Sequence, residues 1–94
     1  MGAAQAIAQA GKTGKTRLCG INFDKAILSQ VDSGKQDCAI DQQGYQQGFY
    51  AVSILNGYIN YGLNIPTREI LTGPGVVDST NIKATLAGAS QGTR

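Results

Sequence analysis

The chain contains no histidine and no tryptophan among its 94 residues. Without histidine it lacks the commonest general base, the usual partner of a serine or cysteine nucleophile, and a common zinc ligand. We therefore expect no catalytic residues, no metal site and no cofactor. The sequence favours a protein that is not an enzyme.

Charge is also scarce, with eight Lys and Arg residues against six Asp and Glu residues. Only Lys12, Lys15 and Arg17 lie close together, whereas nucleic-acid binding requires a clustered basic face. We therefore predict no nucleic-acid partner. No apolar run has the length of a membrane span. The residues after Met1 lack the charged start and long apolar stretch of a signal peptide, so we expect none in this chain.

Cysteine is limited to Cys19 and Cys38, which are not spaced as metal ligands. Each lies in a short apolar run that resembles a buried strand. The sequence leaves a disulfide open, but it favours two buried free thiols.

The segments that are present alternate between helical and extended patterns. Helices are expected at residues 3–10, 25–31 and 45–61, and short strands at 16–23, 37–41 and 69–72, with a further extended run at 76–77. This alternation predicts an α/β fold with parallel βαβ units. Because the chain begins with a helix and has few strands, we interpret residues 1–86 as an incomplete lobe and 87–94 as a flexible tail.

One motif superficially suggests nucleotide binding. The run GKTGKT, residues 11–16, resembles a phosphate-binding P-loop, which needs a glycine at the position of Gln9. It also needs a strand before the loop and a helix after it, and the expected order here is the reverse. We interpret this run as a solvated basic turn.

Polar residues follow the first two expected strands. Asn22, Phe23 and Asp24 follow one strand, and Asp41 and Gln42 follow the other. Ligands of open parallel sheets bind beyond the carboxyl ends of the strands, and amides and carboxylates suit the hydroxyl groups of a polyol. The alternative is that the polar residues cap the helices that follow, and Asp24 is the strongest capping candidate. Phe23 is either a ring face for a sugar or a core residue.

Longer stretches resemble a known family. The runs IDQQGYQQGFYAVSILNGYINYGLN (residues 40–64), ILTGPGVVDSTNI (70–82) and GAAQAIAQAGKTGKTRLCGINFDKAIL (2–28) are similar to the C-terminal part of type 1 periplasmic (sugar) binding proteins. Members of that family deliver sugars to ABC transporters. Two positions depart from the family pattern: Asn22 replaces a usual Asp, and Gly44 replaces a usual Pro.

The resemblance implies a partial three-layer, parallel-sheet lobe of a solute-binding protein. It implies a sugar or polyol ligand, with Asn22, Gln42 and Asp41 as the binding residues, and we add Phe23 as a candidate from its side-chain chemistry. It also implies a membrane permease as partner and a periplasmic or extracellular, lipid-anchored location for the intact protein. Since family members bind the sugar between two lobes, we expect this chain alone to be inactive and to self-associate.

Two alternatives are compatible with the same residues. The chain could be the effector-binding lobe of a sugar-responsive transcription regulator, in which the helix at 45–61 would face a dimer partner. A less favoured alternative is a glycosidase fragment that uses Asp24 and Asp41 as a carboxylate pair, although nothing in their spacing favours it.

Overall fold

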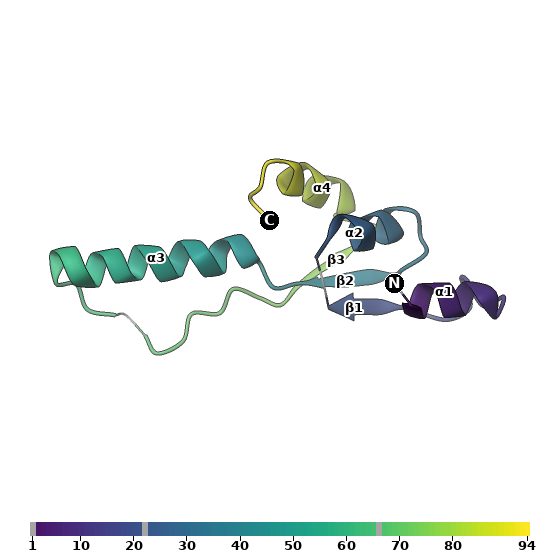
Figure 1. Ribbon diagram of the computed structural model, residues 1–94, viewed down its shortest axis with the longest axis horizontal. Coiled ribbons are helices and arrows are strands. Elements are labelled where there is room, and N and C mark those ends of the chain that lie inside the picture. Colours follow the sequence, from purple (N-terminus) through teal and green to yellow (C-terminus); the bar gives the residue numbers. More distant parts are fainter. Residues whose placement is uncertain (1, 22, 66) are drawn as a thin grey trace.

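Helices and short strands alternate along the chain in the computed structural model, which describes residues 2–21, 23–65 and 67–94. In chain order the elements are α1 (Gly2–Gln9), β1 (Cys19–Ile21), α2 (Lys25–Asp32), β2 (Cys38–Asp41), α3 (Gly44–Tyr61), β3 (Gly75–Asp78) and α4 (Ile82–Ser90). Figure 1 shows a small body formed by the sheet, α2 and α4, from which α3 projects to one side and α1 to the other. The α/β fold class predicted from the sequence is confirmed.

The three strands form one sheet in the order β1-β2-β3. β1 and β2 are parallel, as expected, but β3 pairs with β2 in the antiparallel direction. The chain leaves β2, runs out along α3 and returns to the same end of the sheet, so the next strand must run back against β2 (Figure 1). The predicted strand at residues 69–72 is wrong, because pairing begins only at Gly75.

The core lies between one face of the sheet and the helices α2 and α4. It comprises Ile27, Leu28 and Val31 of α2, Ala39 of β2, Val77 of β3 and Ile82 of α4. Side chains alternate between the two faces of a strand, so the neighbours of Ala39 and Val77 point to the opposite face. That opposite face is poorly covered: Ile21 is 63% exposed and Val76 is 53% exposed.

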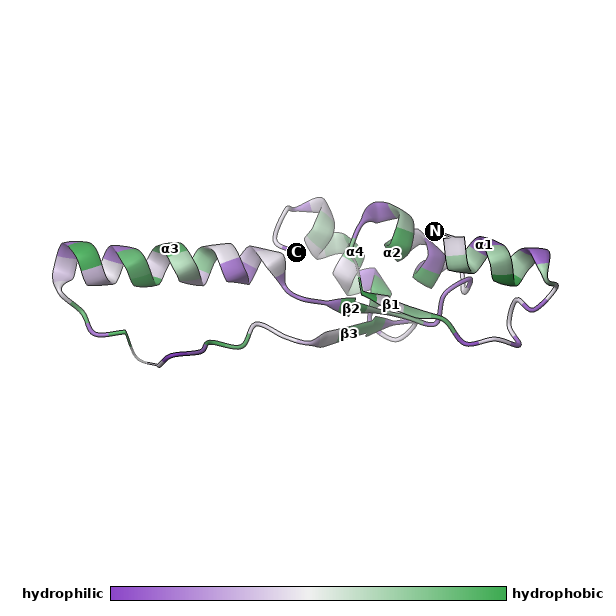
Figure 2. Ribbon diagram, turned by 60° about the horizontal axis from the view of Figure 1, so that its bottom comes forward, coloured by the Kyte–Doolittle hydropathy of each residue, from purple (hydrophilic) through white to green (hydrophobic). Residues whose placement is uncertain are grey.

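Helix α3 matches the helix predicted at residues 45–61 to within one residue. Its apolar residues follow helical spacing, yet no residue of α3 is buried. The helix instead projects from the sheet, and the return segment (residues 62–65 and 67–74), here called the strap, runs back beside it (Figure 1). Figure 2 shows hydrophobic residues distributed along this projecting helix. The described residues include no helix with the combined length and hydropathy needed to cross a bilayer.

Predicted helix boundaries are confirmed by the capping contacts. Asp24 caps α2, because its carboxylate accepts a 2.8 Å hydrogen bond from the Ile27 backbone N–H. Gly11 ends α1 with a φ of 64° and Gly62 ends α3 with a φ of 63°, a backbone region in which glycine has no steric cost. The GKTGKT run joins α1 to β1 as a loop, in the order that excludes a P-loop.

Helix α4 was not predicted, and residues 87–90 of the expected flexible tail belong to it. Ile82 and Thr85 are buried, and Leu86, Gly88 and Ala89 are half-buried. All of these except Gly88 follow the spacing of one helical face. The sequence did not indicate this face clearly, because Ala and Thr are only weakly hydrophobic.

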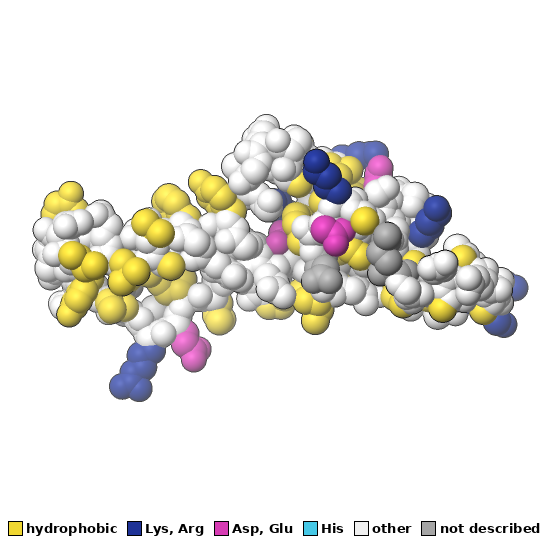
Figure 3. Space-filling model, viewed as in Figure 1, with side chains coloured by type: hydrophobic (Ala, Val, Ile, Leu, Met, Phe, Trp, Pro, Cys, Tyr) yellow, Lys and Arg dark blue, Asp and Glu magenta, His cyan; other side chains and the backbone are white. Residues whose placement is uncertain are grey.

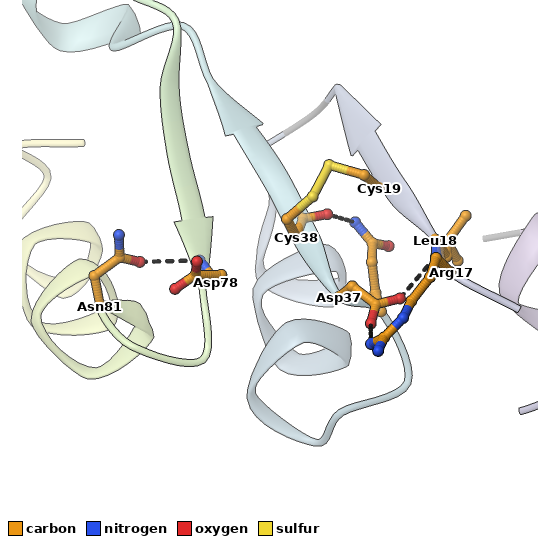
Figure 4. The surroundings of a disulfide bond; sticks show 8 residues. Arg17, Leu18, Cys19, Asp37, Cys38, Asp78 and Asn81 are labelled. Carbon is orange, nitrogen blue, oxygen red and sulfur yellow. Dashed lines mark hydrogen bonds and ion pairs between the residues drawn. A yellow bond between two sulfur atoms is a disulfide. The ribbon is translucent and has the colours of Figure 1, made fainter. Parts of the chain in front are cut away.

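The prediction for the cysteines is wrong on pairing and on burial. Cys19 and Cys38 form a disulfide, with their Cα atoms 4.6 Å apart, and Cys19 is exposed. The two residues are direct partners in the β1–β2 register, so their side chains point to the same face of the sheet. Figure 4 shows the bond bridging the two strands, close to the Asp37 carboxylate that contacts Arg17 and the Leu18 backbone N–H.

Candidate functional site

Three of the four predicted binding residues line one cavity. The cavity has a volume of about 210 Å³ and lies where β1 and β2 end. Its lining residues are Phe23, Ile40, Asp41, Gln42, Gly44 and Arg94. The fourth predicted residue, Asn22, lies outside the described residues. The expectation that polar residues gather beyond the carboxyl ends of the parallel strands is thus met for Asp41 and Gln42.

Asp41 is the buried polar centre of this site, with 3% of its surface exposed. One carboxylate oxygen, Oδ1, accepts a 2.7 Å hydrogen bond from the Gln43 backbone N–H. The other, Oδ2, lies 3.6 Å from Nη1 of Arg94. The carboxylate therefore holds the turn after β2 and compensates the charge of Arg94.

Gln42 lies where the arm, formed by α3 and the strap, joins the sheet. Its backbone carbonyl accepts hydrogen bonds from Nε2 of Gln47 at 2.8 Å and from Oγ1 of Thr72 at 3.0 Å, which ties α3 and the strap together. Gln43 beside it has a φ of 55°, a conformation that non-glycine residues rarely adopt. The Gln42 residue itself is exposed, so its amide can reach a ligand in the cavity.

Close backbone packing fixes this junction from the other side. A Cβ atom on Gly73 would lie 3.0 Å from the carbonyl oxygen of Asp41, too close for any other residue without a shift. The close approach of the strap to the end of β2 therefore explains why position 73 of the TGPG run is a glycine. This contact positions the turn that carries Gln42.

Phe23 is half-buried and packs against the core formed by α2 and α4. It lines the cavity with Asp41 and also a wider groove of about 670 Å³ between α2 and α4. Both interpretations of Phe23, as a core residue and as a ring face in the site, agree with this position.

Arg94 is the charged residue of the cavity that was not predicted from the sequence. It was assigned to the flexible tail, but its Nη1 donates a 3.1 Å hydrogen bond to Oγ1 of the buried Thr85. The C-terminus lies beside the junction of β2 and α3 in Figure 1, in agreement with the Asp41 contact. A glycine at position 92 after a run of helix formers was the available signal, because such a glycine commonly turns a chain back over its helix.

The proposed carboxylate pair of a glycosidase is not assembled at this cavity. Asp24 caps α2 and lines the α2–α4 groove, whereas Asp41 lines the cavity at the end of β2. In the part of the chain that the structure describes, no three His, Cys, Asp or Glu side chains are grouped to hold a metal ion.

No family model and no curated protein matches the chain by sequence. Solved structures do match it in three dimensions, and two of them are described here. One is a carbohydrate transporter from Acidothermus cellulolyticus 11B in complex with myo-inositol, with 35% identity and a TM-score of 0.79. The match covers 98% of this chain and 32% of that one.

The other similar structure is a periplasmic ribose ABC transporter protein from Conexibacter woesei DSM 14684, with 26% identity and a TM-score of 0.78. That match covers 96% of this chain and 30% of the other. The chain therefore spans about a third of the length of both proteins.

The chain thus has an α/β lobe fold of the kind found in transport proteins that bind sugars. More specifically, it has the fold of part of a type 1 periplasmic sugar-binding protein, which confirms the resemblance drawn from the sequence. One of these similar proteins is a carbohydrate transporter, and the other is a periplasmic ribose ABC transporter protein.

Proposed function

We propose that this chain provides one wall of the sugar- or polyol-binding cleft of a solute-binding protein that serves an ABC transporter. The observation that carries the proposal is the cavity at the ends of β1 and β2, which brings Phe23, Asp41 and Gln42 together. It occurs in a fold that matches a protein bound to myo-inositol.

The residues at this wall suit a hydroxyl-rich ligand. The Gln42 amide both donates and accepts hydrogen bonds, and Phe23 offers an apolar surface to the carbon face of a ring. In this role Asp41 positions the turn rather than contacting the ligand, because its oxygens already face Gln43 and Arg94. We keep Asn22 in the proposed site because the family resemblance of the sequence implies it.

The proposed partners follow from the same role. A protein of this kind closes around its ligand and delivers it to a membrane permease without chemical change. We propose a periplasmic or extracellular, lipid-anchored location for the intact protein. The Cys19–Cys38 disulfide supports such a location, because disulfides persist in oxidising compartments.

Binding by the chain alone is expected to be no tighter than millimolar. A single open wall leaves most of a small ligand in water, and the remaining contacts hardly offset the cost of immobilising it. Isothermal calorimetry against a panel of pentoses, hexoses and cyclitols would measure this. A micromolar dissociation constant for any of them would contradict the proposal that the site is only half formed.

The residue roles are tested in a protein in which this chain is joined to a complete partner lobe. We expect Gln42→Ala and Asn22→Ala each to weaken sugar binding by about 1–3 kcal/mol, the usual cost of an unsatisfied polar group. Asp24→Ala is the matched control: it removes the α2 cap, lowering the melting temperature while leaving affinity unchanged. Loss of binding in Asp24→Ala with stability intact would reverse these assignments.

We also infer that the chain by itself associates with further copies. β1 is an outer strand of the described sheet, and Ile21 and the apolar residues of α3 are exposed. An open strand edge and an uncovered apolar helix both favour pairing with a second chain.

A further inference from the structure

The wall of the cavity contains an ion pair whose role the preceding proposal does not cover. We propose that Arg94 is a further ligand-binding residue, and that the Asp41–Arg94 pair makes the site select neutral polyols over anionic sugars. This inference rests on the proposed sugar-binding function.

The position of Arg94 is built into the end of α4. The Thr93 backbone N–H donates to the Gly88 carbonyl at 3.1 Å and the Gly92 N–H donates to the Ala89 carbonyl at 3.2 Å. With Gly92 at a φ of 71°, these two bonds form the common left-handed helix stop that reverses the chain. The reversal returns Arg94 over α4 toward the end of β2.

Close packing keeps the side chain of Arg94 in this place. A Cβ atom on Gly88 would lie 3.5 Å from Cδ of Arg94, so the aliphatic stem lies directly on the surface of α4. The guanidinium then reaches the buried Thr85 hydroxyl and the buried Asp41 carboxylate. A merely solvated terminal arginine would make neither contact.

The guanidinium retains hydrogen-bonding capacity toward the cavity. It carries five N–H donors, and its contacts to Thr85 and Asp41 within the described residues both use Nη1. The side chain is 44% exposed and lines the cavity together with Gln42. The remaining donors form a planar fork, which fits two oxygens on adjacent carbons of a polyol.

The charge balance of the cavity determines which oxygens it accepts. Asp41 and Arg94 are the charged residues among those that line it, and their charges are opposite. Because Asp41 is buried, its negative charge is poorly screened and opposes an incoming anion. Arg94 can thus donate hydrogen bonds to hydroxyl groups. Because the charges of Asp41 and Arg94 balance, the site offers no net electrostatic attraction to a carboxylate or phosphate.

The test is an NMR titration of the isotope-labelled chain joined to a complete partner lobe, using the backbone amides of this chain and its Arg94 side-chain N–H signal. The probes are myo-inositol, D-glucose and D-glucuronate, the last two forming a matched neutral and anionic pair. We expect the signals of the cavity residues to respond to myo-inositol and glucose at millimolar concentrations, and more weakly to glucuronate.

Substitutions then separate the role of Arg94 from the function as a whole. We expect Arg94→Ala to weaken myo-inositol binding about fivefold to tenfold, the effect of losing hydrogen bonds from a charged donor. Arg94→Lys, which keeps the charge but loses the fork, should also weaken it. Arg68→Ala is the control, because Arg68 lies on the strap and lines no part of this cavity. Asp41→Asn should raise glucuronate affinity relative to glucose.

Each negative outcome has a distinct meaning. If no probe shifts any cavity signal when the chain is joined to a complete partner lobe, the proposed function fails, and the inference fails with it. If the probes bind but Arg94→Ala behaves like Arg68→Ala, the proposed function stands and Arg94 is not a ligand contact. If glucuronate binds the unmodified chain as tightly as glucose, the selection of neutral ligands is wrong.

Discussion

At the scale of single residues, Asp37 shows how one carboxylate joins two distant segments. It accepts a 2.8 Å hydrogen bond from the Leu18 backbone N–H and pairs with the Arg17 guanidinium (Figure 4). The Leu18 hydrogen bond, followed by the contact with Arg17, lowers the pKa of Asp37 below its ordinary value of 3.8. The ionised form is therefore favoured in the folded chain.

This lowered pKa gives a pH dependence with a definite sign. A carboxylate whose pKa is lowered on folding stabilises the fold at pH values above its pKa in the unfolded chain. That contribution is lost as the pH falls through the lower pKa of the folded chain. We expect the melting temperature to fall as the pH drops below the ordinary pKa of 3.8, and to fall less steeply in Asp37→Asn. Thermal unfolding followed by circular dichroism would measure this.

Glu69→Gln is the matched control for that measurement, since Glu69 is an exposed carboxylate on the strap. Asp78, whose pKa is also lowered, by hydrogen bonds from the Thr80 hydroxyl and backbone N–H, remains in both variants. Identical acid profiles for Asp37→Asn and Glu69→Gln would show that Asp37 contributes nothing to acid stability.

At the scale of elements, β1 depends on few contacts. It has three residues and pairs with β2, and among the described strands it lies at the edge of the sheet. The disulfide joins it to β2 at the start of the shared register, and the Asp37 bond to Leu18 adds one further link. Gln36 supports the same region by donating to the Cys38 carbonyl at 2.7 Å.

We therefore predict that the disulfide makes a large contribution to stability. Its two cysteines are 19 residues apart, and closing a loop of that size is worth about 3 kcal/mol in the chain-entropy model. Replacing both cysteines by serine should lower the free energy of unfolding by about that amount. Chemical denaturation with and without a reducing agent would measure it.

The double serine variant also supplies the control for reduction. It should unfold at the same denaturant concentration in either condition, whereas the unmodified chain should unfold earlier when reduced. Equal stability of the unmodified chain in both conditions would mean that the paired strands hold without the covalent link.

At the scale of the whole molecule, the chain is elongated. Its extents are 59 × 25 × 20 Å and its radius of gyration is 17.3 Å, against about 12 Å for a compact domain of this length. The difference comes from α3 and the strap, which project from the body. Figure 3 shows hydrophobic side chains gathered along this arm, and residues 44–61 contain no charged residue.

This shape makes self-association the expected behaviour of the chain. Val52 and Ile59 of α3 are 68% and 71% exposed, and covering such surface is favourable by about 25 cal/mol per Å². We predict a homodimer or larger assembly at micromolar concentration. Gel filtration coupled to light scattering would measure the mass, and a monodisperse, cooperatively folded monomer would contradict the prediction.

Two variants would show which surface makes the contact. Ile59→Lys places a charge on α3, and Ile21→Lys places one on the open face of the sheet at β1. Both positions are exposed, so neither change is expected to disturb the core. Dissociation by the first alone would assign the contact to the arm, and dissociation by the second alone would assign it to the sheet.

What the sequence determined by itself was local in origin. The bounds of α2 and α3, the Asp24 cap and the glycine stops at Gly11 and Gly62 could all be predicted. Each depends on side chains and backbone groups within a few residues along the chain, so the pattern contains the necessary information. The gathering of Asp41 and Gln42 at the end of β2 was predictable for the same reason, once the strand was identified.

Tertiary structure alone decided the remaining features, because they join residues far apart in the sequence. The Cys19–Cys38 bond depends on strand register, and the direction of β3 depends on the path of an arm more than thirty residues long. The apolar stripe of α3 predicted a helix, but only the path of the chain left that stripe exposed. Arg94 enters the site only because the end of α4 turns it back onto Asp41, a contact that no local pattern encodes.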